Sequence, residues 1–184
     1  MKKKSQQSCL LITVICMLLF STSFKEKKYL YNNTFIQKPL NSLTINGGEY
    51  NGGVTYTLSN DKKNAFGLLA DGRITATVKD VVVSGNDKNE ITINMDFPAK
   101  APAAYSLPDD NGDNEATIEI SHYQNDQLII THDFTVKKGT LKITSIDKKF
   151  AIGSFDFTST DTDLTKTEVD YHIKGNFKVA LMSL

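Results

Sequence analysis

Apolar side chains alternate with polar ones along most of the chain after residue 28, and the spacing of an amphipathic helix does not appear over any useful length. A period of two predicts strands with one buried and one solvated face. The predicted strands are Tyr29–Ile36, Ser42–Asn46, Val54–Leu58, Ala65–Ala70, Arg73–Val83, Glu90–Phe97, Ala104–Leu107, Ala116–Tyr123, Gln127–Val136, Thr140–Ile146, Phe150–Thr158 and Glu168–Leu181.

Turn-forming residues separate these segments, among them Asn46-Gly47-Gly48, Asn51-Gly52-Gly53 and Ser84-Gly85-Asn86-Asp87. Short strands broken by turns at such intervals are typical of an antiparallel β-sandwich, and a lipocalin-like β-barrel is the alternative. The sequence has no tryptophan, no repeat and no low-complexity linker, so we expect residues 24–184 to form a single all-β domain.

The last predicted strand has the clearest alternation. We expect its odd positions to face the core and its even positions to face water. The odd set is Val169, Tyr171, Ile173, Gly175, Phe177, Val179 and Leu181, and the even set is Glu168, Asp170, His172, Lys174, Asn176 and Lys178.

Two hairpins have a register that the apolar pattern selects, because a shift by one residue reverses every side chain. A three-residue turn at Asp147-Lys148-Lys149 places Leu141 and Ile143 on the face of Gly153, Phe155 and Phe157. A three-residue loop at 124–126 likewise places these side chains on one face: Ile118, Ile120, His122, Leu128, Ile130, His132 and Phe134.

The N-terminus has the three parts of a secretory signal. Lys2, Lys3 and Lys4 precede an uncharged apolar run at 9–20, and the small residues at 21–23 predict cleavage before Phe24. The run is short for a bilayer core of about 30 Å, which disfavours an uncleaved anchor. Lipid attachment at Cys16 is the alternative, although Ile15 occupies a position where a lipobox has a small residue. The chain is therefore predicted to be exported, to the periplasm or the cell exterior.

Cleavage at this position changes the composition of the mature chain. Cys9 and Cys16 are both removed, so the mature domain has neither disulfides nor a thiol nucleophile. Of 21 basic and 21 acidic residues, the mature part keeps 18 and 21. This mildly acidic balance argues against nucleic acid as a partner, because binding phosphates requires a basic surface.

Histidine is the first candidate for chemistry, and the sequence contains three. In the preferred register, His122 and His132 share a face but lie four residues apart along the strands, about 13 Å. Two ligands of one zinc ion each lie about 2 Å from it, so a shared metal is not expected. We interpret both as half-buried histidines with hydrogen-bond partners, and His172 as a surface residue.

Other polar motifs do not predict a catalytic, cofactor or metal site. The acidic segment Asp109–Glu115 has oxygen side chains at alternate positions, but lacks the sixth-position glycine and twelfth-position glutamate of an EF-hand loop. The segment 158–167, with Asp161 and Asp163, is predicted to be a polar loop. The pairs Gly47-Gly48 and Gly52-Gly53 precede strand patterns rather than a helix, so they do not predict a phosphate loop.

The tyrosines are spread along the chain, and β-sheet packing is the simpler interpretation of them. If several converge on an exposed face, they can bind sugar. They are Tyr29, Tyr31, Tyr50, Tyr56, Tyr105, Tyr123 and Tyr171.

The C-terminal half resembles a family of uncharacterised secreted proteins and lipoproteins from Bacteroidota. The resemblance rests on Gly139-x-Leu141-x-Ile143-Thr144-x-Ile146-Asp147, on Gly153-Ser154-Phe155-x-Phe157, and on Val169 with Gly175-Asn176-Phe177. It implies an exported envelope β-domain and supplies no functional residue. This chain differs from members that carry a lipobox cysteine before the mature domain.

Three functions follow from these features, in order of preference. The first is a non-enzymatic envelope domain that binds a protein or a glycan. The second is a lipocalin-like carrier of a small apolar ligand, because small barrels enclose such cavities. The third is a hydrolase that uses scattered aspartate and glutamate residues.

Overall fold

The computed structural model describes residues 41–162 and 165–183. The predicted signal at 1–23 and the predicted strand Tyr29–Ile36 lie outside these residues. The described elements are β1 (Asn41–Asn46), η1 (Gly48–Tyr50, a 3₁₀ helix), β2 (Val54–Leu58), β3 (Ala65–Ala70), β4 (Arg73–Ser84), β5 (Asp87–Pro98), β6 (Ala103–Leu107), β7 (Glu115–Gln124), β8 (Gln127–Thr135), β9 (Lys138–Ile146), β10 (Phe150–Thr162) and β11 (Glu168–Ser183).

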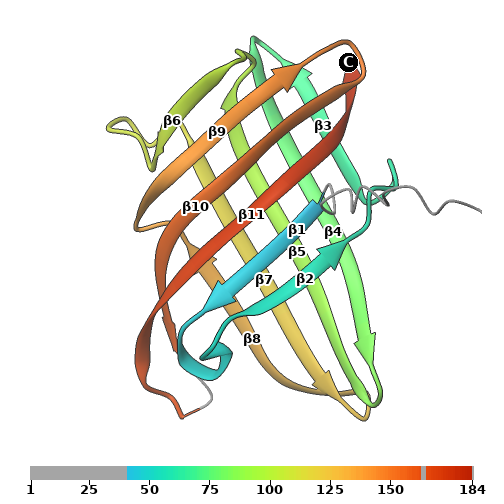
Figure 1. The fold of residues 1–184 in the computed structure, drawn as a ribbon, viewed down its shortest axis with the longest axis vertical. Coiled ribbons are helices and arrows are strands. Elements are labelled where there is room, and N and C mark those ends of the chain that lie inside the picture. Colours follow the sequence, from blue (N-terminus) through green and yellow to red (C-terminus); the bar gives the residue numbers. More distant parts are fainter. Residues whose placement is uncertain (1–40, 163–164, 184) are drawn as a thin grey trace, which may run out of the picture. The chain divides into compact units, whose positions relative to one another are not determined.

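The predicted all-β class is confirmed, but the two-sheet sandwich is wrong, because the described strands belong to one 11-stranded sheet. Its order is β6-β9-β10-β11-β3-β4-β5-β7-β8, with β1 paired to β11 and β2 paired to β1 (Figure 1). All pairs are antiparallel except β11 with β3. Within 41–162 and 165–183, no helix has the length and apolar character needed to cross a membrane.

Strand β11 is the reason that the sheet is continuous. One of its edges pairs with β10 along the whole of β10. Its other edge pairs first with β1, at His172–Asn176, and then with β3, at Ala180–Ser183. A strand of 16 residues is long enough to serve both partners. Strand β11 therefore joins β6, β9 and β10 on one side to β3, β4, β5, β7 and β8 on the other in one sheet.

Strands β8 and β10 are distant in the strand order but lie close together. The backbone N–H of Lys137 donates to the Thr158 carbonyl at 2.8 Å, and the Ser159 hydroxyl donates to the Thr135 carbonyl at 2.7 Å. These are single bonds and not a ladder. The sheet is therefore not closed into a barrel, and the barrel alternative is also wrong.

The inner face of the sheet forms one hydrophobic core. It includes five aromatic side chains that are almost wholly buried: Phe97, Phe134, Phe157, Tyr171 and Phe177. Burying an apolar side chain of this size contributes about 1.5–3 kcal/mol relative to exposure. The interior is thus filled by side chains.

The predicted faces of β11 are confirmed. Tyr171, Ile173, Phe177 and Val179 are buried, and the even positions from Glu168 to Asn176 are exposed. A Cβ on Gly175 would overlap the Ser42 carbonyl oxygen of β1 and the Phe155 ring. The missing side chain therefore allows β1 and β11 to pair over the core.

The two hairpin predictions have different outcomes. Residues 147–149 join β9 and β10, and Leu141 lies opposite Phe155 and Ile143 opposite Gly153 as predicted, although a register shift beside Gly153 changes the pairing next to the turn. Between β7 and β8 the predicted shared face is correct except for Leu128, which pairs with Tyr123 and lies on the outer face, and the predicted loop is wrong. The strands are joined by two residues, Asn125-Asp126, and a bulge beside His122 restores the parity that a third loop residue was expected to supply.

Candidate functional site

A short segment after β1 carries two of the site residues. Gly47 and Gly48 have φ values of 128° and 50°, in the region that glycine tolerates best. A Cβ on Gly48 would lie 2.5 Å from the Tyr171 hydroxyl oxygen, so the glycine lets η1 pack directly on β11. The sequence predicted a turn here. The turn continues into η1, which places Glu49 and Tyr50 over the core.

His132 lies at the centre of a buried charged cluster. Its side chain is 0% exposed and has one carboxylate near each ring nitrogen. Nε2 contacts Oε1 of Glu49 from η1, and Nδ1 lies 2.9 Å from Oδ2 of Asp161 at the end of β10. The cluster therefore joins η1, β8 and β10.

Hydrogen bonds extend the cluster beyond His132. Nδ1 of His132 has a hydrogen-bond partner in Asp161, whereas Nε2 contacts Glu49 without the geometry of a hydrogen bond. The two carboxylates are further held by other donors. The Tyr171 hydroxyl donates to Oε2 of Glu49 at 3.1 Å, and the Asp133 backbone N–H donates to Oδ2 of Asp161 at 3.1 Å.

Aromatic rings enclose the imidazole. Phe134 stacks on it at a centroid distance of 5.3 Å, and Tyr50 meets it edge-on at 5.7 Å. The Tyr171 ring lies 6.0 Å away. The rings and the two carboxylates together surround the imidazole, which is 0% exposed.

Two tyrosines of the site titrate abnormally. Burial raises the pKa of Tyr50, and the neighbouring Tyr56, Glu49 and Tyr171 act in the same direction. Burial also raises the pKa of Tyr56, although its hydrogen bond with Tyr50 opposes the change. Both hydroxyls therefore remain neutral hydrogen-bonding groups across the physiological range.

A pocket of about 220 Å³ adjoins this cluster, and we call it the η1 pocket. Its polar lining comes from Glu49, Tyr50, Tyr56, Asn89 and His122, and its apolar lining from Val54 and Ile130. Residues of η1 and β2 thus face residues of β5, β7 and β8. Aromatic and apolar walls with a few converging polar groups are typical of a small-molecule site.

His122 confirms part of its prediction and corrects another part. It is half-buried, and its Nδ1 lies 3.0 Å from the Asn89 side-chain oxygen. It pairs with Ile130, and His132 pairs with Ile120. The two histidines are therefore two residues apart along the strands, about 7 Å, and not four. His132 was predicted to be half-buried and is instead fully buried.

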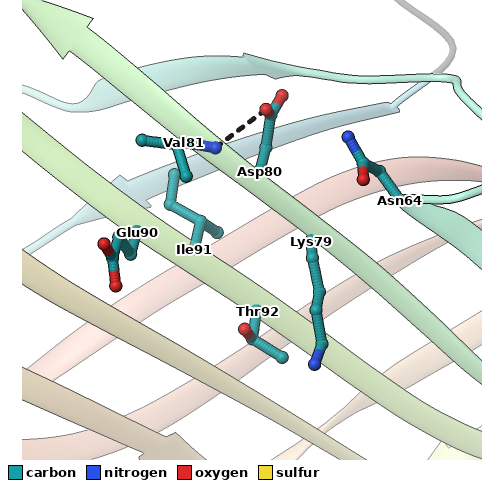
Figure 2. Close-up of a pocket in the computed structure, with 7 residues that line it drawn as sticks. All are labelled: Asn64, Lys79, Asp80, Val81, Glu90, Ile91 and Thr92. Atoms are coloured by element: carbon teal, nitrogen blue, oxygen red, sulfur yellow. Dashed lines mark hydrogen bonds between the residues drawn. The ribbon is translucent and has the colours of Figure 1, made fainter.

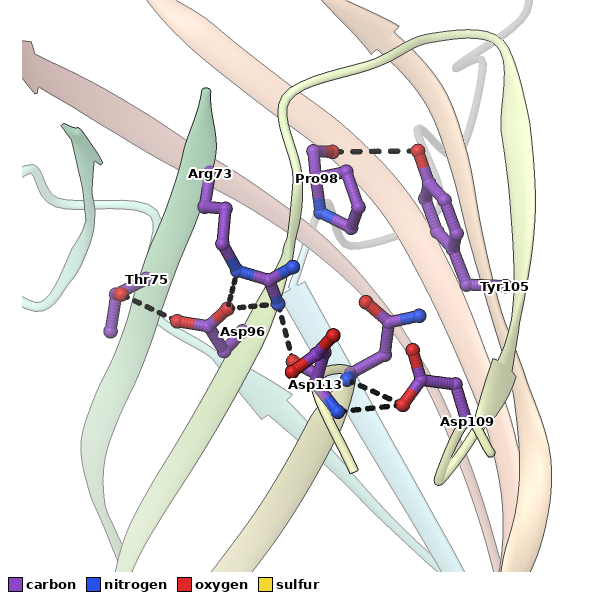
Figure 3. Close-up of polar contacts among 8 residues, drawn as sticks. Arg73, Thr75, Asp96, Pro98, Tyr105, Asp109 and Asp113 are labelled. Carbon is purple, nitrogen blue, oxygen red and sulfur yellow. Dashed lines mark hydrogen bonds and ion pairs between the residues drawn. The ribbon is translucent and has the colours of Figure 1, made fainter. Parts of the chain in front are cut away.

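The acidic segment Asp109–Glu115 forms a turn that Arg73 contacts through the Asp113 backbone carbonyl, as Figure 3 shows. Oδ1 of Asp109 accepts the backbone N–H of Asp113 at 2.6 Å. The Arg73 guanidinium donates to the Asp113 carbonyl and to the Asp96 carboxylate, which also accepts the Thr75 hydroxyl at 2.8 Å. Arg73 therefore holds the turn against β4 through the backbone, and its carboxylate partner, Asp96, lies outside the acidic segment.

A second hollow, of about 360 Å³, lies beside β4 and β5 (Figure 2). One of its two carboxylates, Asp80, accepts the backbone N–H of Val81 at 2.8 Å and that of Ser59 at 2.6 Å. The second bond holds the chain after β2 against β4. The other carboxylate, Glu90, pairs with Lys88. We interpret this hollow as structural.

The remaining predicted positions also have different outcomes. His172 is a surface residue as predicted, paired with Asp156 at 2.7 Å. Asp161 was placed in a polar loop, but β10 extends through Thr162 and carries it to His132. Asp163 lies outside the described residues. Among those that are described, no group of three or more His, Cys, Asp or Glu side chains has a geometry that holds a metal ion.

Three of the scattered tyrosines converge at the η1 pocket and its cluster. Tyr50 and Tyr56 line the pocket, and the Tyr50 and Tyr171 rings meet edge-on at 6.3 Å. Glu49 is the site residue that sequence reasoning missed. The only local signal for it was the pair Gly47-Gly48, whose backbone freedom lets η1 reach Tyr171.

The fold and the site define a domain with one large mixed sheet and a buried histidine–carboxylate cluster beside a small pocket. By sequence, the chain belongs to the family described as Domain of unknown function (DUF6252), whose family model matches residues 69–179. His122, His132, Asp161 and Tyr171 lie within the matched segment, whereas Glu49, Tyr50 and Tyr56 precede it. No curated protein and no solved structure matches this chain.

Proposed function

We propose that this chain is an exported, non-enzymatic domain of the cell envelope that binds a glycan through the η1 pocket. The observation that carries the proposal is the convergence of Tyr50, Tyr56, Glu49, Asn89 and His122 around one pocket. Tyrosine rings supply rigid apolar surface with a polar end. Carboxylate, amide and imidazole groups supply the acceptors and donors that sugar hydroxyls require.

The packed interior weighs against a carrier of apolar ligands. A lipocalin-like carrier holds its ligand inside a closed barrel. Here the sheet is open, and its inner face is filled by the aromatic and aliphatic core. The pocket lies beside that core and has a mixed polar and apolar lining.

The positions of the carboxylates weigh against a hydrolase. A glycosidase needs two carboxyl groups that both face the scissile bond. Glu49 and Asp161 instead face the two nitrogens of His132, and Asp161 does not line the pocket. Their arrangement favours a structural cluster that holds one wall of a binding pocket.

Titration calorimetry with a panel of monosaccharides and disaccharides tests the proposal. We expect saturable binding of at least one sugar and a loss of about tenfold or more in affinity for Tyr56→Phe and His122→Ala. Tyr105→Phe, outside the pocket, is the matched control. If no sugar binds, or if both pocket variants bind as well as wild type, the glycan proposal is wrong. Cleavage of a bound sugar would assign the chain to the hydrolases.

Export rests on the N-terminal pattern and has its own test. We expect the protein recovered from the producing cells to begin at Phe24. Intact-mass measurement and N-terminal sequencing check this start. A mass that retains Cys16 together with acyl chains would instead identify a lipid-anchored protein.

A further inference from the structure

The outer face of the sheet carries exposed apolar side chains at one end of four adjacent strands. Val83 of β4 lies opposite Lys88 of β5, Lys88 lies opposite Tyr123 of β7, and Tyr123 lies opposite Leu128 of β8. Val83 and Leu128 are 65% and 56% exposed. Val81 lies two residues from Val83 on the same face and is 53% exposed. We call Val81, Val83, Tyr123 and Leu128 the outer-face patch.

The charges within this patch compensate each other. The Lys88 ammonium lies 4.2 Å from the centre of the Tyr123 ring and 3.1 Å from a carboxylate oxygen of Glu90. The aliphatic stem of Lys88 therefore bridges the valines and the tyrosine. A contiguous apolar surface of this kind marks an interaction site more often than scattered apolar residues do.

Two acids lie on the same face, farther along β7 and β8. Glu119 of β7 and Asp133 of β8 are directly opposite each other, and both are exposed. Like charges at directly opposed positions destabilise a sheet. Within the described part of the chain, none of the ion pairs includes either carboxylate. Glu119 lies four residues from Tyr123 along β7, about 13 Å.

We propose that the outer-face patch binds an extended segment of a partner protein, with apolar side chains over the valines and Leu128 and a lysine or arginine over Glu119 and Asp133. The unpaired acids supply the charge complementarity that selects this occupant. The bulge at Ile129 interrupts the free edge of β8, so recognition falls on the side chains of the outer face.

A second copy of this chain fits the surface less well. When two patches face each other about a twofold axis, Glu119 and Asp133 of one copy approach the far end of the other patch. That end carries Asp126 in the turn between β7 and β8, whereas Asp87 pairs with Gln124 on the inner face. Acids thus meet an acid at both ends of the contact.

The test uses the full chain and two short synthetic peptides of alternating valine and threonine, one ending in two lysines and the other in two glutamates. Fluorescence anisotropy at low salt should show binding of the lysine peptide about tenfold tighter than of the glutamate peptide. Added salt should reduce the difference. Glu119→Gln combined with Asp133→Asn should abolish the preference, and Val83→Ser combined with Leu128→Ser should weaken binding of the lysine peptide.

Asp71→Asn combined with Asp110→Asn changes the net charge equally at a distance from the patch, and should leave the preference intact. Equal binding of the two peptides, no saturable binding, or binding that the patch variants do not change would overturn the proposal. So would a dimer in solution that Val83→Ser dissociates, because the occupant would then be a second copy. Sugar binding at the η1 pocket involves other residues, so the two proposals fail independently.

Discussion

The His132 cluster and the Arg73 cluster use the same chemistry in different surroundings. Each joins a basic side chain to carboxylates or carbonyls of other segments. His132 is 0% exposed, whereas Arg73 and Asp96 are each 34% exposed. When the Arg73–Asp96 ion pair breaks, water can solvate both side chains. When the contacts of His132 break, water does not reach the imidazole. The comparison teaches that the number of ion pairs says less about stability than the water available to each partner.

The largest expected effect is the loss of the buried His132 side chain. His132→Ala leaves Glu49 and Asp161 without the group between them and removes a ring that packs on Phe134. We expect the free energy of unfolding to fall by about 3–5 kcal/mol, measured by chemical denaturation. A loss below about 1 kcal/mol would show that the cluster is no more coupled than a surface pair.

Two further substitutions separate the charge from the packing. Adding Glu49→Gln and Asp161→Asn to His132→Ala removes both uncompensated carboxylates but not the cavity. If charge dominates, the triple variant should recover a large part of the loss, which is the non-additivity expected of groups in contact. If it is as unstable as His132→Ala, the loss comes from packing.

The next largest effect is a loss of stability at alkaline pH, which should come mainly from the tyrosines beside the His132 cluster. The pKa values of Tyr50 and Tyr56 are raised in the folded state, above the value of about 10 in the unfolded chain. Their contribution is therefore fully present below about pH 10 and is lost as the pH rises through the folded-state pKa values. In that range the unfolded state binds fewer protons, so stability falls by up to about 1.4 kcal/mol per pH unit for each tyrosine.

Denaturation at a series of alkaline pH values measures this slope. Tyr50→Phe should make it shallower, because it removes one of the two groups. Burial also raises the pKa of Tyr105, beside Pro98, but Arg73 opposes the change, so Tyr105→Phe should make the slope shallower by a smaller amount than Tyr50→Phe. An equal change in both variants would contradict the assignment of the effect to the η1 pocket.

The exposed cluster should respond weakly and with a dependence on salt. Arg73→Ala removes the donors to Asp96 and Asp113, and we expect a loss of about 1 kcal/mol at low ionic strength. Salt screens exposed charges, so the loss should shrink as salt is added. Denaturation of both proteins at two salt concentrations tests this. A loss that salt does not change would indicate that Arg73 acts through packing of its stem.

The fold was largely predictable where local pattern determines structure. The alternation from Val169 to Val179 fixed both faces of β11, and the turn at 147–149 followed from Leu141 and Phe155. The single sheet was not predictable, because it depends on the two partners that share one edge of β11. The bulge beside His122 was also missed. A bulge in a strand and an extra residue in the loop put the following side chains of β8 on the same face, so the sequence pattern does not distinguish them.

The candidate site was much less predictable, because its residues meet only in the folded chain. Glu49 and Asp161 flank His132 from segments far away in the sequence, and each lies in a stretch that reads as a turn or a polar loop. The alternation of apolar and polar residues in β8 predicts that His132 faces inward. It does not predict which side chains of other segments contact it. Only the glycines at 47 and 48 indicated an unusual backbone at Glu49.

The smallest expected effect is at His172, which reproduces the chemistry of His132 on the surface. Its Nε2 lies 2.7 Å from Asp156, and the two side chains are 49% and 61% exposed. Water replaces either partner, so we expect His172→Ala to change the free energy of unfolding by less than about 0.5 kcal/mol. Chemical denaturation beside His132→Ala makes the comparison direct, because the same residue type pairs with a carboxylate in both places. Equal losses would mean that burial does not set the energetic difference between the two histidines, and the distinction between buried and exposed clusters would then fail.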